Sequence, residues 1–125
     1  MRDLVSNISP VPAIAPAVQS AAADGAAIDL AGFDSVAFLV NTGAIVGAGD
    51  FGVKVQEGDD GSTFADAPAS AVTSTAPATL AAASSYKVGY VGSKRYVRLS
   101  LTKAGGTSIA LGAIAERGHP AQRPV

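Results

Sequence analysis

The residue types that carry enzymatic chemistry are scarce in this chain. Its 125 residues include one histidine and no cysteine, and the histidine, His119, stands between Gly118 and Pro120. A histidine-based metal site needs further imidazole or thiolate ligands. No serine lies in a Gly-x-Ser-x-Gly motif that would present it as a nucleophile. We therefore expect no catalytic residues, no metal site and no cofactor, and the protein is predicted to be non-enzymatic.

The carboxylates Glu57, Asp59 and Asp60 are close enough in sequence to bind Ca²⁺ or to act as an acid–base pair. They lead into Gly61 and Ser62, and Asp-Asp-Gly is also a common turn sequence because Asp and Gly tolerate positive φ. The segment lacks the ligand spacing and terminal Glu of an EF-hand loop. A hairpin turn is therefore predicted here.

Two further motifs bear on nucleotide or nucleic-acid binding. Residues 43–49 are glycine-rich, but no helix pattern and no Lys/Ser phosphate motif accompany them, so a loop is predicted. Residues 94–98 read Lys-Arg-Tyr-Val-Arg, a mixture of basic and aromatic residues also found on platforms for single-stranded nucleic acid. Only one aromatic residue is available there for stacking. Arg95, Tyr96 and Arg98 are therefore predicted to contact protein, and no nucleic-acid partner is expected.

The elements that position these residues are predicted to be strands. Residues 51–57 and 94–102 alternate between apolar and polar side chains, which indicates half-buried strands. A further strand is predicted at 86–91, and Gly92-Ser93 predicts a tight hairpin turn between it and 94–102. Residues 107–115 are continuously apolar, which is typical of a central strand covered on both faces.

Residues 27–30 and 35–40 complete the set of main strand candidates, and Gly and Asp turns separate most of the strands. The uncharged, Ala/Ser/Thr-rich segment 67–85 is predicted to be a long surface loop. This pattern predicts one all-β domain, an antiparallel β-sandwich or jelly roll. About a fifth of the chain is Ala, which buries little apolar area. The core is therefore thin, and a partner surface would help to stabilise it.

The first 22 residues contain Pro10, Pro12 and Pro16, which favour an extended, polyproline-like segment. We expect an extended N-terminal arm at 1–22, the sandwich at 23–117 and a C-terminal tail at 118–125. A disordered terminus is the alternative reading of the arm. Its apolar side chains are more numerous than a solvated tail needs, and four of them are predicted to contact a partner: Leu4, Ile8, Val11 and Ile14.

The net charge of −1 conceals two blocks of opposite sign. Residues 24–66 are acidic apart from Lys54, and residues 87–123 are basic apart from Glu116. The blocks are complementary within the fold, complementary between copies, or a footprint for nucleic acid. No apolar run reaches the roughly 18 residues that a transmembrane helix needs, so no membrane partner is expected.

Four segments resemble small virion proteins of tailed bacteriophages and prophages: Val-Gln-Glu-Gly-Asp-Asp-Gly-Ser-Thr-Phe (55–64), Tyr-Lys-Val-Gly-Tyr-Val-Gly-Ser-Lys-Arg-Tyr-Val-Arg-Leu (86–99), Gly-His-Pro (118–120) and the opening Met-Arg-Asp-Leu-Val-Ser-Asn-Ile. The resemblance spans most of the chain except the Ala/Ser/Thr-rich loop. It implies a decoration, or cement, protein that binds the outside of the capsid and stabilises it, and it brings no catalytic residues.

The partners implied by this resemblance are the major capsid protein and further copies of the chain, with a trimer favoured. The implied location is the capsid surface of the virion, after synthesis in the host bacterial cytoplasm. Two alternatives remain: another head–tail or tail component, and a carbohydrate-binding or host-surface-binding module on the same fold.

Overall fold

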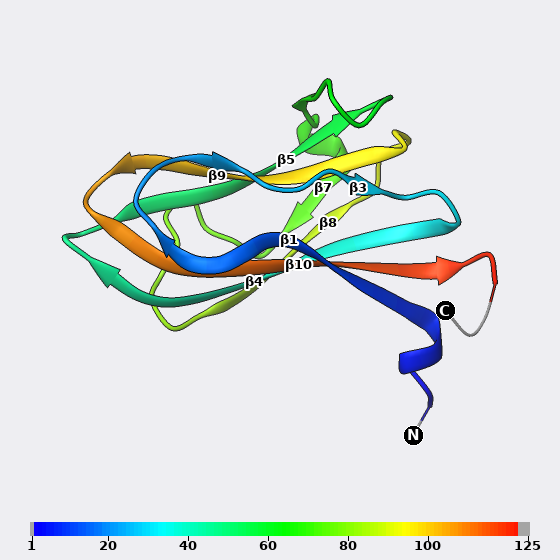
Figure 1. Ribbon diagram of the computed structural model, residues 1–125, viewed down its shortest axis with the longest axis horizontal. Helices are drawn as coiled ribbons and strands as arrows, with labels where there is room; N and C mark the ends of the chain where they lie inside the picture. The colour runs from blue at the N-terminus through cyan, green and yellow to red at the C-terminus, as the bar shows by residue number, and fades with distance from the viewer. Residues whose placement is uncertain (1, 123–125) are drawn as a thin grey trace.

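Two antiparallel β-sheets pack face to face in the computed structural model, which describes residues 2–122 (Figure 1). The predicted all-β, antiparallel β-sandwich is confirmed. Sheet A has the strand order β1-β10-β4-β8-β7, and its strands are β1 (Ile8–Gln19), β4 (Phe33–Val46), β7 (Val72–Ser74), β8 (Ser85–Tyr90) and β10 (Ser108–Pro120). Sheet B has the order β2-β9-β5-β6, with β3 also paired to β9, and its strands are β2 (Ala23–Asp24), β3 (Ile28–Asp29), β5 (Asp50–Gly58), β6 (Ala65–Asp66) and β9 (Tyr96–Gly105).

The core lies between the sheets and follows from the alternation of side chains along each strand. In β4, Val36, Phe38 and Val40 are buried. In β9, Val97, Leu99 and Leu101 are buried, as the sequence pattern of 94–102 predicts. Inward side chains of β10 complete this layer: Ile109, Leu111, Ala113 and Ala115.

Strand β10 is an interior strand of sheet A, next to the edge strand β1. The predicted cover on both of its faces is wrong, because its outward residue Ile114 is 41% exposed. The strand pairs with β1 on one side and with β4 on the other. It also runs on to Pro120, which pairs with Phe33, so the body does not end at residue 117. Only part of the predicted tail, residues 118–125, can be compared, because 123–125 lie outside the described residues.

The predicted arm at 1–22 is extended, but most of it belongs to the sandwich. Residues 8–19 form β1, which pairs with β10 from Ile8 opposite Gly118 to Gln19 opposite Ile109. Proline lacks the N–H of a ladder hydrogen bond and is accepted only in edge strands, where that position faces solvent. Strand β1 is such an edge, and this explains how its three prolines are compatible with a sheet. The expected boundary at residue 22 therefore does not separate an arm from the body.

The predicted hairpin at Gly92-Ser93 is wrong. Strand β8 pairs with β4 and β7 in sheet A, whereas β9 pairs with β5, β2 and β3 in sheet B. The turn sequence was read correctly as a break between strands, but the chain crosses there from one layer to the other. Local turn chemistry does not distinguish a hairpin from such a crossing, since both need a short flexible connection.

The long segment between β6 and β8 closes one side of the sandwich. It contains a 3₁₀ turn, η2 (Ala69–Ala71), and the edge strand β7. Leu80 is buried, and its N–H donates to the Phe51 carbonyl. Thr42 Oγ1 donates to the Ala81 carbonyl and accepts from the Ser84 N–H, which fixes the end of the segment against β4. The predicted loop is thus largely irregular, but it is anchored into the core.

We expect Phe38→Ala to lower the free energy of unfolding by about 3–5 kcal/mol, because it removes a fully buried aromatic ring and leaves a cavity. Its neighbour Leu39 faces outward and provides the control, since Leu39→Ala should cost less than about 1 kcal/mol. Urea unfolding followed by circular dichroism measures both values. Equal decreases in the free energy of unfolding at the two positions would contradict the assigned inner and outer faces of β4.

Candidate functional site

The carboxylates singled out in the sequence each have a partner within the protein. Asp60 Oδ1 accepts hydrogen bonds from the backbone N–H groups of Thr63 and Ser62, and these bonds lower the pKa of Asp60. Asp59 forms an ion pair of 3.0 Å with Lys94. Glu57 accepts from the Tyr90 hydroxyl at 2.9 Å. This geometry agrees with the predicted turn, and no cluster of metal-ligating side chains occurs in residues 2–122.

The sequence did not indicate one contact between a serine and the histidine. Ser35 Oγ lies 2.8 Å from His119 Nδ1, across the paired ends of β4 and β10. The two residues are 84 positions apart, so no local motif signals the contact. In nucleophilic catalysis the imidazole is oriented by a third group, usually a carboxylate. No carboxylate hydrogen-bonds to His119 in the described part of the chain, so the contact lacks the third member of a triad.

The basic residues predicted to contact a partner form pairs within sheet B. Arg95 donates to both carboxylate oxygens of Asp29, at 2.9 Å each. Arg98 stacks 4.4 Å above the Phe64 ring, and its Nε donates to Gln56 Oε1 at 2.7 Å. The Tyr96 ring is half-buried, with the Arg95 guanidinium 5.1 Å from its centre. Arg95 therefore connects the start of β9 to β3, and Arg98 connects β9 to β5.

The opposite charge blocks of the sequence meet within the fold. Ion pairs join Arg95 to Asp29, Lys94 to Asp59, and Arg98 to Asp24. Of the readings that the sequence allowed, complementarity within the chain is therefore present in the structure. It leaves the outer face of sheet B polar, because Ser100 also donates to Asp24 and Lys54 pairs with Asp66.

The apolar residues predicted as partner contacts at the N-terminus fall into different environments. Ile14 is only 7% exposed and belongs to the core, so its side chain is not available to a partner. Ile8 and Val11 are half-buried in β1. Leu4 is the exposed member of the set and precedes a 3₁₀ turn, η1 (Val5–Asn7). The structure does not bring these residues together with Arg95, Tyr96 and Arg98, which belong to sheet B.

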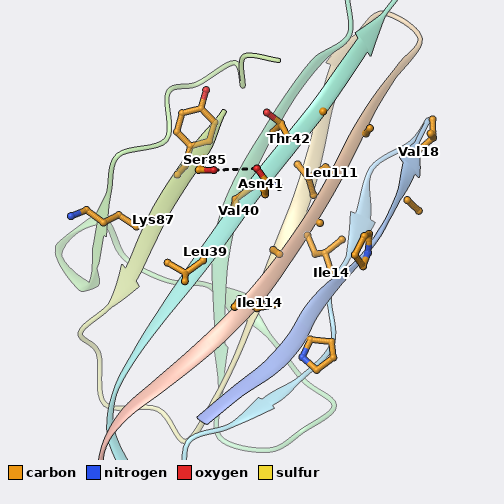
Figure 2. Close-up of a pocket in the computed structure, with 18 of the residues that line it drawn as sticks. Ile14, Val18, Leu39, Val40, Asn41, Thr42, Ser85, Lys87, Leu111 and Ile114 are labelled. Atoms are coloured by element: carbon orange, nitrogen blue, oxygen red, sulfur yellow. Dashed lines mark hydrogen bonds between the residues drawn. The ribbon is translucent and has the colours of Figure 1, made fainter. Parts of the chain in front are cut away.

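The outer face of sheet A is a candidate functional surface that the sequence analysis did not identify. Its side chains alternate with those of the core along β4 and β10, and they are mostly apolar. Leu39 and Ile114 are 37% and 41% exposed and lie directly opposite each other in the ladder. Figure 2 shows them side by side between β8 and β1, with Lys87 at the β8 side. This surface contrasts with the polar outer face of sheet B.

The backbone register gives this surface its shape. One cross-strand row consists of Pro12, Ile114, Leu39 and Lys87, each opposite the next. The neighbouring row contains Gly112, against which Pro16 packs closely. A Cβ atom at position 112 would lie only 3.0 Å from Pro16. Pro16 thus fills the space beside Gly112, and the groove lies over these two rows.

The groove has a volume of about 1070 Å³, and it extends over β1, β10, β4 and β8. Asn41 and Ser85 contribute polar groups to it, and these are joined to each other because Ser85 Oγ donates to Asn41 Oδ1 at 3.1 Å (Figure 2). Lys87 is the charged residue of the lining. Such a surface suits the burial of an apolar partner.

No protein-family model and no curated protein sequence matches the chain. No helix among residues 2–122 has the length and apolar character needed to cross a membrane.

Asp29 makes a pH-dependent contribution to stability. The Arg95 hydrogen bonds, with that of the Ala31 N–H, lower the pKa of Asp29 from its usual 3.8 to about 2. A lowered folded-state pKa stabilises the fold above the unfolded pKa, and this stabilisation is lost as pH falls from about 4 to about 2. Because the pair is solvent-exposed, we expect Asp29→Asn to remove less than about 1 kcal/mol of this pH dependence.

The measurement is urea unfolding of the native protein and of Asp29→Asn between these two pH values. Asp34→Asn is a matched control, since Asp34 is exposed and forms no ion pair in the described part of the chain. The prediction fails if Asp29→Asn and the native protein lose stability in parallel as the solution is acidified.

Proposed function

We propose that this protein is a non-enzymatic structural component of a bacteriophage virion, which binds the outside of the capsid and stabilises it. The observation that carries the assembly part of the proposal is the apolar outer face of sheet A. The capsid part rests on the resemblance of segments 55–64, 86–99 and 118–120 to virion proteins of tailed phages.

Strand β10 gives the first physical argument for assembly. Its inward side chains fill the core, and its outward positions Ala110, Gly112 and Ile114 are also apolar. Central strands that are apolar on both sides usually belong to sheets covered on both faces. Within one copy of the chain, sheet B covers only the inner face. A second protein surface would complete the burial, and large exposed apolar patches commonly mark such contacts.

The long edge of sheet A gives the second argument. An exposed edge strand can recruit another chain by adding a strand to the sheet. In β1, however, Pro10, Pro12 and Pro16 have no N–H to donate. Strand addition along this edge is therefore disfavoured, and the outer face is the better surface for a specific partner.

A carbohydrate-binding role has less support. Sugar-binding sites usually present exposed aromatic rings for stacking. The four Phe and three Tyr of this chain are all buried or half-buried, and two of the half-buried rings, Phe33 and Phe64, lie beneath the guanidinium groups of Arg117 and Arg98. We retain a head–tail or tail component as the alternative within the virion, because it would use the same kind of assembly surface.

The test is to locate the protein on particles produced by the bacterium that carries this coding sequence, using gold-labelled antibody and electron microscopy. We expect label over the whole surface of the head. Label confined to one vertex or to the tail would contradict capsid decoration and favour the alternative virion component. Absence from purified particles would contradict the virion assignment altogether.

Binding to the shell provides a second measurement. We expect Ile114→Glu to weaken cosedimentation with undecorated heads at least tenfold, because it places a charge on the outer face of sheet A. Val91→Glu, at an exposed valine outside this face, is the control. Truncation of residues 1–22 is unsuitable, because it removes β1 and exposes one edge of β10. Equal binding by the two variants would contradict docking through the outer face.

A further inference from the structure

The groove on the outer face of sheet A has a shape that restricts what can cover it. It is a hollow of about 1070 Å³ whose lining includes Leu39, Gly112 and Ile114. If two copies met groove to groove, the hollows would face each other and leave a void, and protein interfaces pack as densely as interiors. A convex apolar element is therefore the better occupant.

The chain itself carries such an element at its N-terminus. Leu4 and Val5 are 62% and 80% exposed. They lie at the start of η1, a turn that is well defined by local hydrogen bonds: the Asn7 N–H donates to the Leu4 carbonyl at 2.9 Å, and Asn7 Nδ2 donates to the Asp3 carbonyl at 2.8 Å. Figure 1 shows this turn at the start of β1, below the end of β10 and apart from the strands of both sheets. It is an ordered apolar projection that nothing in the described chain covers.

The turn cannot reach Gly112 in the groove of its own copy. Strand β1 is fixed at Ile8, opposite Gly118, and Gly112 lies six residues further along β10, which corresponds to roughly 20 Å. Leu4 is four residues from Ile8 and can extend at most about 14 Å from it. The part of the groove around Gly112 is therefore open to the turn of a neighbouring copy and not to the chain's own turn.

Charge favours the same pairing. Lys87 ends the row of large side chains in the groove, and no carboxylate pairs with it among residues 2–122. Glu116 lies on the same outer face and is likewise without an ion pair there. The turn is preceded by Arg2 and Asp3, one charge of each sign. Two opposite-charge contacts are thus available when the turn of one copy meets the groove of another.

We propose that copies of this chain associate head to tail, with Leu4 and Val5 of one copy seated in the groove formed by Leu39, Gly112 and Ile114 of the next. This inference rests on the proposed function in treating the outer face of sheet A as an assembly surface, and it names the partner as a second copy. Such a contact joins two different surfaces, so it forms a ring when the rotation between copies closes.

The test uses sedimentation velocity of the full chain over a concentration series. We expect the native protein to self-associate. Val5→Asp, which alters the turn, and Leu39→Glu, which alters the groove, should each raise the apparent dissociation constant by more than about tenfold. Val91→Asp is the control, since it makes the same change as Val5→Asp at an exposed valine outside both surfaces, and it should associate as the native protein does. Circular dichroism checks that each variant is folded.

Mixing the two variants identifies the geometry. The Leu39→Glu chain retains an intact turn and the Val5→Asp chain retains an intact groove, so the equimolar mixture should form heterodimers that grow no further. A groove-to-groove contact would give no such rescue. Absence of heterodimers, or native-like association of Val5→Asp, would overturn the proposal.

The outcome is separable from that of the proposed function. If the native protein stays monomeric while Leu39→Glu loses binding to undecorated heads, a shell protein occupies the groove; the head-to-tail inference is then wrong and capsid decoration stands. If the native protein associates and the variant mixture forms heterodimers, but the protein is absent from particles, the inference stands and the virion assignment is wrong.

Discussion

The pairing of β10 on both of its edges is the constraint from which the rest of the structure follows. Because β1 and β4 flank it, β10 is an interior strand of sheet A, and its period of two sends Ile109, Leu111, Ala113 and Ala115 into the core. The same alternation sends Ala110, Gly112 and Ile114 to the outer face. An apolar strand in this position can cover only one of its faces within a two-layer sandwich. The apolar outer face is therefore a direct consequence of the strand that organises the core.

The fold class and most strands could be predicted from the sequence, because alternation and turn residues are local signals. The alternation of 94–102 gave the correct inward residues. The apolar run at 107–115 gave an interior strand, but it also predicted cover on both faces, and the outer face is exposed. The errors are errors of pairing. Gly92-Ser93 breaks the chain between β8 and β9, but whether the next strand stays in the same sheet depends on contacts far away in sequence. Likewise, Pro10 and Pro12 indicate an extended backbone, but not that β10 would accept it as an edge strand.

The candidate site was harder to predict than the fold, because it depends on register. Leu39 and Ile114 are 75 positions apart and become neighbours only through the antiparallel pairing of β4 with β10. The need for glycine at position 112 is visible only in the structure, where Pro16 packs over it. Leu4 was predicted to be a contact residue because it is apolar in a segment without a core pattern, and it is exposed in the structure. Ile14 looked the same in sequence, yet it is buried, since the irregular pairing after Pro12 places both Ala13 and Ile14 in the core.

The distribution of charge explains why the two outer faces differ. The basic block of the chain lies largely in β9 and the turn before it, and its partners Asp24, Asp29 and Asp59 lie in or beside sheet B. These ion pairs place charged side chains of both signs on one side of the sandwich, and they make that side polar. Sheet A takes its strands from segments with few charges, so its outer face remains apolar around Lys87. The charge blocks thus act within the chain to connect the strands of sheet B. They leave the outer face of sheet A largely apolar, and this is the surface on which we propose contact with other chains.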